Sequence, residues 1–226
     1  MGRPAKFFLL VLAPALAVLL AWLGLKTLQT NLLGWFLMLT GLAYVFGMVI
    51  VFFVRREGFW DSQLGGKAVE EEHKDYSFWL IALAMAAVFY LSPLEYLYFS
   101  AILMRKAWMP IAGVALVALG TGLFIWARRT LGANYSGHVS VRSDQKLVQS
   151  GPYRFIRHPA YLGYLGMALG ISLGYSSIAG VGAIVVLFLP SLVYRINVEE
   201  RLLSKYFGES YRTYADTSKK IIPGIW

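Results

Sequence analysis

Long apolar runs without a charged residue dominate the chain and predict helices that cross a membrane. A bilayer core about 30 Å thick requires roughly 20 apolar residues in a helix. Four runs of this kind come first, at residues 7–25, 32–54, 76–94 and 107–127. The first of them continues without interruption past its signal-peptide-like small residues, so we interpret it as a membrane anchor.

A fifth apolar run, residues 159–194, is too long for a single crossing, because a helix of that length, rising about 1.5 Å per residue, would overshoot the bilayer core. Gly, Tyr, Ser and Ser at 174–177 supply turn-forming residues near its middle. We therefore expect two short helices in a hairpin, with small residues at Gly166, Gly170 and Gly174 for close helix packing. The pattern as a whole predicts an all-α integral membrane protein, a polytopic bundle of about six transmembrane helices.

Positive charge falls almost entirely on one side of the predicted membrane. With the N-terminus in the cytoplasm, all but three of the 21 Lys and Arg residues lie in cytoplasmic segments, the exceptions being Lys26, Arg105 and Lys106. Cytoplasmic loops of membrane proteins carry such an excess. Both termini are therefore predicted to be cytoplasmic, and the net charge of +9 is explained by an association with membrane lipids, without a nucleic-acid partner.

Composition narrows the class of protein further. Hydrophobic residues make up 58% of the chain and charged residues 15%, against roughly 45–50% and 25% in globular proteins. These values exclude a water-soluble enzyme and a disordered chain. The absence of cysteine excludes thiolate chemistry, and the histidines, His73, His138 and His158, are too scattered to predict a metal site.

The distribution of polar residues divides the chain into two parts. Residues 1–127 hold four predicted spans of generic lipid-facing sequence, and residues 128–226 form a predicted catalytic region that is dense in Gly, Tyr, Arg, His and Glu. Polar sequence concentrates at 55–77, 128–158 and 195–226. We interpret the first of these segments as a solvated connector and expect the chemistry in the other two.

One strip of the second polar segment has the residues of an anion site. Pro159 suits the first position of a helix, because its missing N–H would be unpaired there in any case. Arg157 and His158 then lie at a helix N-terminus, where backbone N–H groups and the helix dipole attract anions. Tyr153 precedes His158 by five positions and Tyr161 follows it by three. This pattern favours a ligand site over a pair of basic interfacial anchors.

The last apolar run leads into a segment that contains Arg195, Glu199 and Glu200. Arg195 and Glu199 are four positions apart and share a helix face. Glu199 and Glu200 point about 100° apart and cannot form a matched pair of catalytic carboxylates. A lone Glu199 turned toward the bundle could bind an amine, a ribose hydroxyl or a cation, while a salt-bridge cluster with Arg195 and Arg201 remains the alternative.

These polar blocks resemble the isoprenylcysteine carboxyl methyltransferase family of integral membrane enzymes and its relatives, the phospholipid methyltransferases. The family pattern Leu-Val-x-x-Gly-x-Tyr-x-x-x-Arg-His-Pro-x-Tyr-x-Gly is matched at every position of residues 147–163. The second block, Glu-Glu-x-x-Leu followed by Phe-Gly-x-x-Tyr-x-x-Tyr, is matched by Glu199, Glu200, Leu203, Phe207, Gly208, Tyr211 and Tyr214. The resemblance covers residues 130–223.

The resemblance implies methyl transfer from S-adenosyl-L-methionine, bound in a cytoplasmic pocket, to a lipophilic or lipidated acceptor, for example the carboxylate of a prenylcysteine. It implies cofactor contacts from His138, Gln145, Lys146, Leu147, Val148, Tyr153, His158, Pro159, Ala160, Tyr161 and Glu199. Arg157 and His158 suit the cofactor's carboxylate, the tyrosine rings suit its adenine or sulfonium, and Glu199 suits its amine or ribose. Arg195 falls where the family keeps an arginine beside the reacting carboxylate, so Arg195 and Glu199 are the expected catalytic residues.

Two other functions stay open from the sequence. A membrane reductase that uses NADPH on a lipophilic enone is similar in helical layout, but we find no further basic pocket for its cofactor. A non-enzymatic membrane scaffold would require no ligand site. The expected location is the cell membrane of a prokaryote or the endoplasmic reticulum membrane of a eukaryote, with the active site facing the cytoplasm.

Overall fold

The structure is a computed structural model that describes residues 12–54, 70–71, 76–99, 105–135, 140–141 and 145–222. Helices account for most of this part of the chain. The longer helices are α2 (Ala13–Thr27), α3 (Leu33–Val54), α5 (Ser77–Tyr98), α6 (Trp108–Leu131), α7 (Pro159–Gly174), α8 (Ile178–Ala183), α9 (Leu189–Phe207) and α10 (Glu209–Thr217). The shorter elements are the 3-10 turns η2 (Gly132–Asn134) and η3 (Gly151–Arg154), the π-helical turn η4 (Ile184–Phe188), and the strands β1 (Glu70–Glu71) and β2 (Ser140–Val141), which pair antiparallel.

Each apolar run of the sequence forms the helix expected of it. The first four runs become α2, α3, α5 and α6. Residues 7–11 of the first run lie outside the described residues, and the other ends differ from the predicted limits by at most four residues. The fifth run forms the expected hairpin, because α7 ends at Gly174 and α8 begins at Ile178. The second arm continues past the apolar run, as the shared helix face of Arg195 and Glu199 requires, because α8, η4 and α9 join into one continuous helix that ends at Phe207.

Three of the described helices are long and apolar enough to cross a membrane: Ser77–Tyr98, Trp108–Leu131 and Ile178–Phe207. The apolar helix α2 is shorter, and so is α7 with its 16 residues. The prediction of an all-helical membrane protein is confirmed by this arrangement. The count of six crossings and the side on which the termini lie stay predictions.

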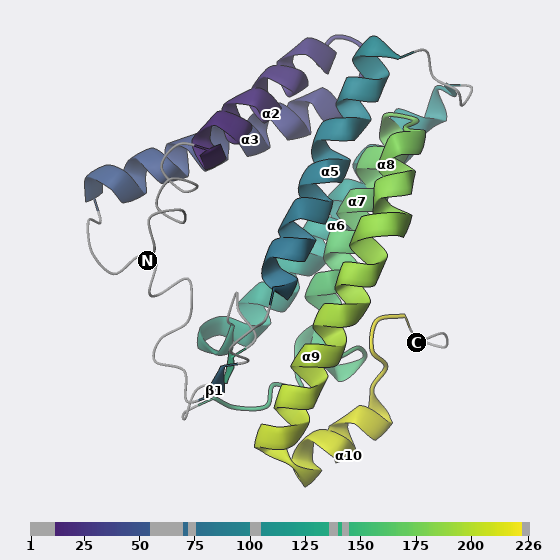
Figure 1. The fold of residues 1–226 in the computed structure, drawn as a ribbon. Helices are drawn as coiled ribbons and strands as arrows, with labels where there is room; N and C mark the ends of the chain where they lie inside the picture. The colour runs from purple at the N-terminus through teal and green to yellow at the C-terminus, as the bar shows by residue number, and fades with distance from the viewer. Residues whose placement is uncertain are drawn as a thin grey trace.

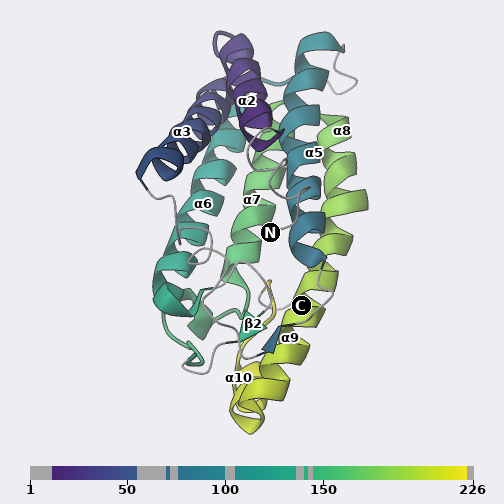
Figure 2. The same cartoon turned by 60° about the vertical axis from the view of Figure 1, so that its left-hand side comes forward.

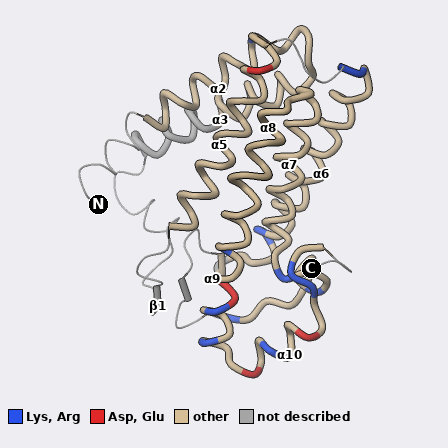
Figure 3. The backbone as a smooth tube through the Cα atoms, turned by 45° about the vertical axis from the view of Figure 1, so that its right-hand side comes forward, with Lys and Arg blue, Asp and Glu red and all other residues tan. Residues whose placement is uncertain are grey.

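The helices are arranged so that segments far apart in the sequence meet at one end. Figure 1 shows α5, α6, α7 and the α8–α9 helix running along one another, with the α2–α3 hairpin inclined against one end and α10 at the other. Figure 2 shows the same arrangement from the side of α2 and α3. In Figure 3, most of the Lys, Arg, Asp and Glu residues of the described chain gather around the end formed by α9 and α10, and a few lie at the opposite end. The polar chemistry therefore lies beside α10.

Glycines let α6 and α7 pack backbone against backbone. A Cβ atom added to Gly120 would lie 2.6 Å from the carbonyl oxygen of Gly163, and one added to Gly170 would lie 2.7 Å from that of Gly113. Such close approach is typical of small-residue stripes on membrane helices. The packing role expected of Gly170 is confirmed, and Gly163 extends the stripe to the first turn of α7. This contact fixes the N-terminus of α7 beside the C-terminus of α6.

Polar contacts hold the turn of the hairpin at the opposite end of the bundle. The carboxylate of Glu95, on α5, accepts hydrogen bonds from Ser177 Oγ at 2.5 Å and from the backbone N–H of Ala179 at 2.9 Å. The side chain of Asn31 donates to the carbonyl oxygen of Gly174 at 2.7 Å. With the turn fixed to α5 and to the α2–α3 connection, both arms of the hairpin reach the α10 end in a defined register.

Candidate active site

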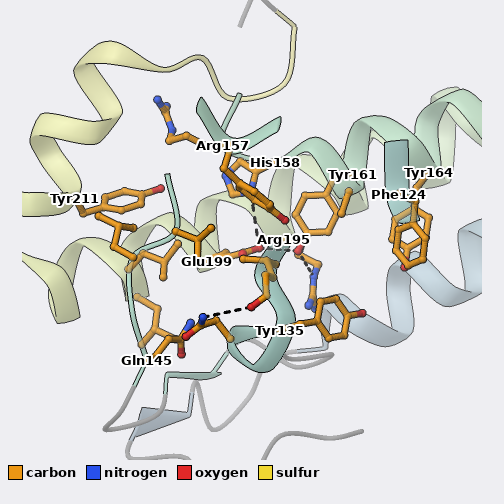
Figure 4. Close-up of a pocket in the computed structure, with 18 of the residues that line it drawn as sticks. Phe124, Tyr135, Gln145, Arg157, His158, Tyr161, Tyr164, Arg195, Glu199 and Tyr211 are labelled. Carbon is orange, nitrogen blue, oxygen red and sulfur yellow. Dashed lines mark hydrogen bonds and ion pairs between the residues drawn. The ribbon is translucent and has the colours of Figure 1, made fainter. Parts of the chain in front are cut away.

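A cavity of about 350 Å³ lies at the α10 end of the bundle, between α5, α6, α7, α9 and α10 and the loop that precedes η3. Figure 4 shows that its walls come from segments far apart in the chain. The predicted site residues that line it are Gln145, Lys146, Leu147, Val148, Tyr153, Arg157, His158, Ala160, Tyr161, Arg195 and Glu199. Pro159 begins α7, as predicted, but is buried and does not line the cavity. His138 lies outside the described residues.

The centre of the cavity is a chain of hydrogen bonds that joins three helices (Figure 4). The hydroxyl of Tyr161, on α7, donates to Glu199 Oε2 at 2.6 Å and accepts from Arg195 Nε at 2.6 Å. Arg195 Nη1 donates to Ser77 Oγ, at the start of α5, at 2.9 Å. Arg195 is 6% exposed, so these bonds fix a buried guanidinium. The shared helix face of Arg195 and Glu199, inferred from their spacing, is confirmed because both contact one hydroxyl.

The two adjacent carboxylates of α9 face different surroundings. Glu200 Oε1 lies 2.8 Å from Arg157 Nε, and its Oε2 lies 3.2 Å from Lys220 Nζ. Glu199 instead bonds to Tyr161 and lines the cavity. Their angular separation along the helix accounts for this division, as expected. Glu200 therefore pairs with Arg157 and Lys220, while Glu199 faces the cavity, and its role as a ligand contact stays a prediction.

Arg157 joins the motif loop to the C-terminal segment. Besides Glu200, its guanidinium donates to the carbonyl oxygen of Ala215 at 2.7 Å and to that of Ser218. The backbone N–H groups of Arg157 and His158 donate to the carbonyl oxygens of Lys219 and Lys220, at 2.7 and 3.0 Å. The segment after α10 thus runs beside the loop as a short parallel bridge. In the described structure this arginine organises one wall of the cavity, and its role as a ligand for an anion stays a prediction.

His158 is buried at the N-terminal end of α7. Its ring stacks on that of Tyr161 with the centroids 5.5 Å apart and the planes 17° apart. Its Nε2 atom lies 3.4 Å from Glu200 Oε1 but has no aligned hydrogen-bond partner among the described residues. The ring thus lies between the Tyr161 ring and the Glu200 carboxylate at the edge of the cavity, and its role as a cofactor contact stays a prediction.

One part of the cavity is apolar. Phe78, Ile81 and Met85 of α5 line it together with Phe124 of α6. The ring centroids of Phe124 and Tyr164 are 5.0 Å apart. These residues belong to the predicted region 1–127, so the boundary at residue 127 marks a change in sequence character and does not limit the site. The cavity therefore offers charged groups and an apolar surface side by side.

Sequence reasoning missed several residues of the site besides those of the apolar part, and three of them have a distinct place in it: Ser77, Asn134 and Tyr211. Ser77 holds Arg195 from 118 positions away, and no local pattern marks it. Asn134 accepts a hydrogen bond at 3.0 Å from the backbone N–H of Lys146 and so positions the strip that begins at Gln145. Tyr211 lines the cavity with a buried hydroxyl that has no partner among the described residues. Of the three, only Tyr211 had a signal, because it lies in the second sequence block.

The sequence of the chain is similar to those of known methyltransferases. A family model described as phospholipid methyltransferase matches residues 108–210. The chain is 29% identical to protein-S-isoprenylcysteine O-methyltransferase B of Arabidopsis thaliana over 151 residues, which cover 65% of this chain and 77% of that protein. It is 32% identical over 117 residues to the protein-S-isoprenylcysteine O-methyltransferase of Saccharomyces cerevisiae, covering 51% of this chain and 49%, about half, of that protein.

A solved structure shares the fold. The eukaryotic intramembrane Ras methyltransferase, an isoprenylcysteine carboxyl methyltransferase, superposes with a TM-score of 0.63 at 23% sequence identity. The match covers 96% of this chain and 77% of that one. Together the similarities favour methyl transfer over a reductase or a scaffold.

Proposed function

We propose that this chain belongs to the isoprenylcysteine carboxyl methyltransferase family of integral membrane enzymes, to which its similarities point, and that it transfers the methyl group of S-adenosylmethionine to the carboxylate of a lipophilic acceptor. The observation that carries the proposal is the Tyr161 hydroxyl, which joins Glu199 to Arg195 inside one cavity. One anionic and one cationic side chain thus lie on either side of a single hydroxyl. A donor that carries a positive charge and an acceptor that carries a negative one can meet there.

The residues of the cavity fit S-adenosylmethionine. This cofactor supplies an activated methyl group on a sulfonium when it is bound. The carboxylate of Glu199 suits its amine or ribose hydroxyls, and the ring face of Tyr153 suits a sulfonium. The Tyr211 hydroxyl is a buried polar atom without a hydrogen-bond partner among the described residues, and a polar ligand in the cavity would satisfy it.

Arg195 is the group that we assign to the acceptor. Its bonds to Ser77 and Tyr161 fix the plane of the guanidinium before the acceptor arrives. A fixed guanidinium orients a carboxylate while leaving the attacking oxygen nucleophilic. An ionised carboxylate requires no general base, so positioning and the exclusion of water supply most of the rate.

The apolar wall indicates the kind of acceptor. Phe78, Ile81, Met85 and Phe124 line the cavity beside Arg195, and they suit an aliphatic or prenyl chain attached to the carboxylate. The relatives in Arabidopsis and yeast are named for isoprenylcysteine, and we propose the same acceptor class here. A phospholipid amine, the acceptor suggested by the name of the family model, fits less well because a buried guanidinium repels a protonated amine.

The active site is proposed to face the cytoplasm. Support comes from the charge asymmetry of the sequence and from the gathering of charged residues around α9 and α10 (Figure 3). We also propose that residues 128–226 hold most of the donor contacts, while α5 adds Ser77 and, together with Phe124 of α6, the apolar wall.

A transfer assay tests the function directly. The detergent-purified protein is incubated with methyl-labelled S-adenosylmethionine and a farnesylated N-acetylcysteine. The matched control acceptor carries a carboxamide in place of the carboxylate. We expect base-labile methyl ester to form only with the carboxylate, and binding titrations to show affinity for S-adenosylmethionine but not for NADPH. Transfer to phosphatidylethanolamine in its place would contradict the assigned acceptor, and failure to bind the donor would overturn the function.

A further inference from the structure

The helix α10 folds back beneath the cavity because of a single glycine. Gly208 has a φ angle of +55°, a conformation that favours glycine, and it separates the end of α9 from the start of α10. The turn brings two tyrosines, Tyr211 and Tyr214, onto the buried face of α10. Both line the cavity, so this short helix forms one of its walls.

The two tyrosine hydroxyls differ in how they are bonded. The Tyr214 hydroxyl donates to the carbonyl oxygen of Tyr153 at 2.7 Å, which fixes α10 to the motif loop. The Tyr211 side chain is only 3% exposed, and its hydroxyl has no hydrogen-bond partner among the described residues. Figure 4 shows its ring at one side of the cavity with the hydroxyl directed inward. Since buried hydroxyls are rarely left unpaired, this one points to a ligand.

The surroundings of Tyr211 keep its hydroxyl a donor. Burial raises the pKa of the Tyr211 phenol well above its usual range, and the negative charge of Glu200 raises it further. Glu200 is itself bound by Arg157 and Lys220, and Glu199 by Tyr161. The neutral phenol therefore has a proton to offer to an acceptor oxygen that enters the cavity.

We infer that Tyr211 is a binding residue for the methyl donor, and that its hydroxyl donates a hydrogen bond to an oxygen of that ligand. The inference rests on the proposed function, because it takes S-adenosylmethionine as the ligand. The oxygens available on that molecule are those of the carboxylate and of the ribose. In either case α10 closes the donor site with a direct contact, in addition to forming its wall.

The variant Tyr211→Phe tests the inference, with Tyr214→Phe as its matched control on the same helix face. Affinity for S-adenosylmethionine is measured by calorimetry in detergent, and the unfolding temperature is measured without ligand. For Tyr211→Phe we expect affinity to fall about fivefold to tenfold, with the ligand-free unfolding temperature unchanged or raised. For Tyr214→Phe we expect the ligand-free unfolding temperature to fall, because a bond within the protein is lost.

Two analogues identify the oxygen that is bound. S-adenosylhomocysteine has both the carboxylate and the ribose. 5′-Methylthioadenosine has the ribose but lacks the carboxylate. A loss of affinity in Tyr211→Phe with both analogues supports a bond to the ribose. A loss with S-adenosylhomocysteine alone supports a bond to the carboxylate.

Failure of this inference and failure of the proposed function give different results. If the unchanged protein binds S-adenosylmethionine and Tyr211→Phe binds it equally well, the contact is overturned and the function stands. If Tyr211→Phe lowers the ligand-free unfolding temperature as Tyr214→Phe does, with no further loss of affinity, Tyr211 is structural and the inference fails. If the unchanged protein does not bind the donor, the function fails and the inference with it.

Discussion

The hydroxyl of Tyr161 is the residue-scale feature on which the site depends. It has one proton, which it donates to Glu199, and it accepts a hydrogen bond from Arg195. Through it the groups assigned to the donor and to the acceptor are held in one geometry. The spacing of Arg195 and Glu199 predicted their common face, and the motif around His158 predicted Tyr161. Ser77 was beyond prediction, because a serine at the start of an apolar helix has no local signal for a partner on α9.

Removing the Tyr161 hydroxyl affects both halves of the site. In Tyr161→Phe the buried Arg195 and the partly exposed Glu199 each lose a charge-assisted bond, so we expect kcat/KM to fall about 100-fold. Steady-state kinetics with each substrate varied in turn measures the effect. A rise in only one of the two KM values, with kcat unchanged, would show that the hydroxyl does not couple the two sites.

Ser77 acts on the acceptor through Arg195. We expect Ser77→Ala to raise the KM for the acceptor about fivefold to tenfold, while affinity for S-adenosylmethionine stays the same. Ser92→Ala removes a buried serine hydroxyl from the same helix away from the cavity and serves as the control. Equal effects of the two variants would argue against a positioning role for Ser77.

The Tyr214 phenol makes the stability of the folded protein depend on pH above about pH 10. Burial raises the pKa of Tyr214 to about 12, whereas the phenol of an unfolded chain ionises near pH 10. The stability that this group contributes is therefore complete below about pH 10 and is lost as the pH rises toward 12. We expect the difference in unfolding temperature between the wild type and Tyr214→Phe to be constant from pH 8 to 9.5 and to shrink above pH 10. A difference that grows with pH would contradict this account.

At the scale of elements, the site depends on two contacts that hold α7 and the C-terminal segment in place. Glycines bring the first turns of α7 against α6, and Arg157 ties the motif loop to the segment after α10. The sequence predicted the first contact from the stripe of small residues. It did not predict the second, because Arg157 at a helix N-terminus also has the pattern of an anion ligand. In the structure Arg157 donates to the carbonyl oxygens of Ala215 and Ser218, more than 50 positions further along the chain, and no local pattern marks these partners.

The α6–α7 contact is tested by a pair of glycines on α6. Gly120→Ala places a Cβ atom 2.6 Å from the carbonyl oxygen of Gly163, whereas a Cβ atom on Gly122 meets nothing within 4 Å. We expect Gly120→Ala to lower the unfolding temperature and to weaken donor binding, because the N-terminus of α7 moves. Gly122→Ala should leave both unchanged or raise stability slightly through its better helix propensity. The same response in both variants would contradict the backbone packing.

The Arg157 contact is tested by hydrogen exchange. Arg157→Lys keeps the charge but loses the planar set of donors that reaches Glu200, Ala215 and Ser218. We expect faster exchange at the amides of Arg157, His158 and Lys219, with Arg154→Lys, at an exposed position, as the control. Unchanged exchange together with weaker donor binding would show that Arg157 binds the ligand directly.

At the scale of the whole molecule, the two ends of the bundle have different tasks. Glu95 and Asn31 fix the turn of the hairpin at one end, and the charged side chains of Lys146, Arg157, Arg195 and Glu199 line the cavity at the other. The apolar runs, the hairpin and the concentration of charge were readable from the sequence, because a membrane imposes length and polarity on each segment. The sequence did not predict which helices are neighbours, because a helix that is apolar on every face does not show which side packs against another helix.

The most direct test of the central claim compares two variants, Glu199→Gln and Arg195→Lys, by the KM for the methyl donor and the KM for the acceptor. Both substitutions keep the size of the side chain, and both residues contact the same Tyr161 hydroxyl. Kinetics with labelled S-adenosylmethionine and a farnesylated N-acetylcysteine should show that Glu199→Gln raises chiefly the KM for the donor and Arg195→Lys chiefly that for the acceptor. An acceptor KM left unchanged by Arg195→Lys, or a donor KM left unchanged by Glu199→Gln, would contradict the assignment of one cavity to both substrates.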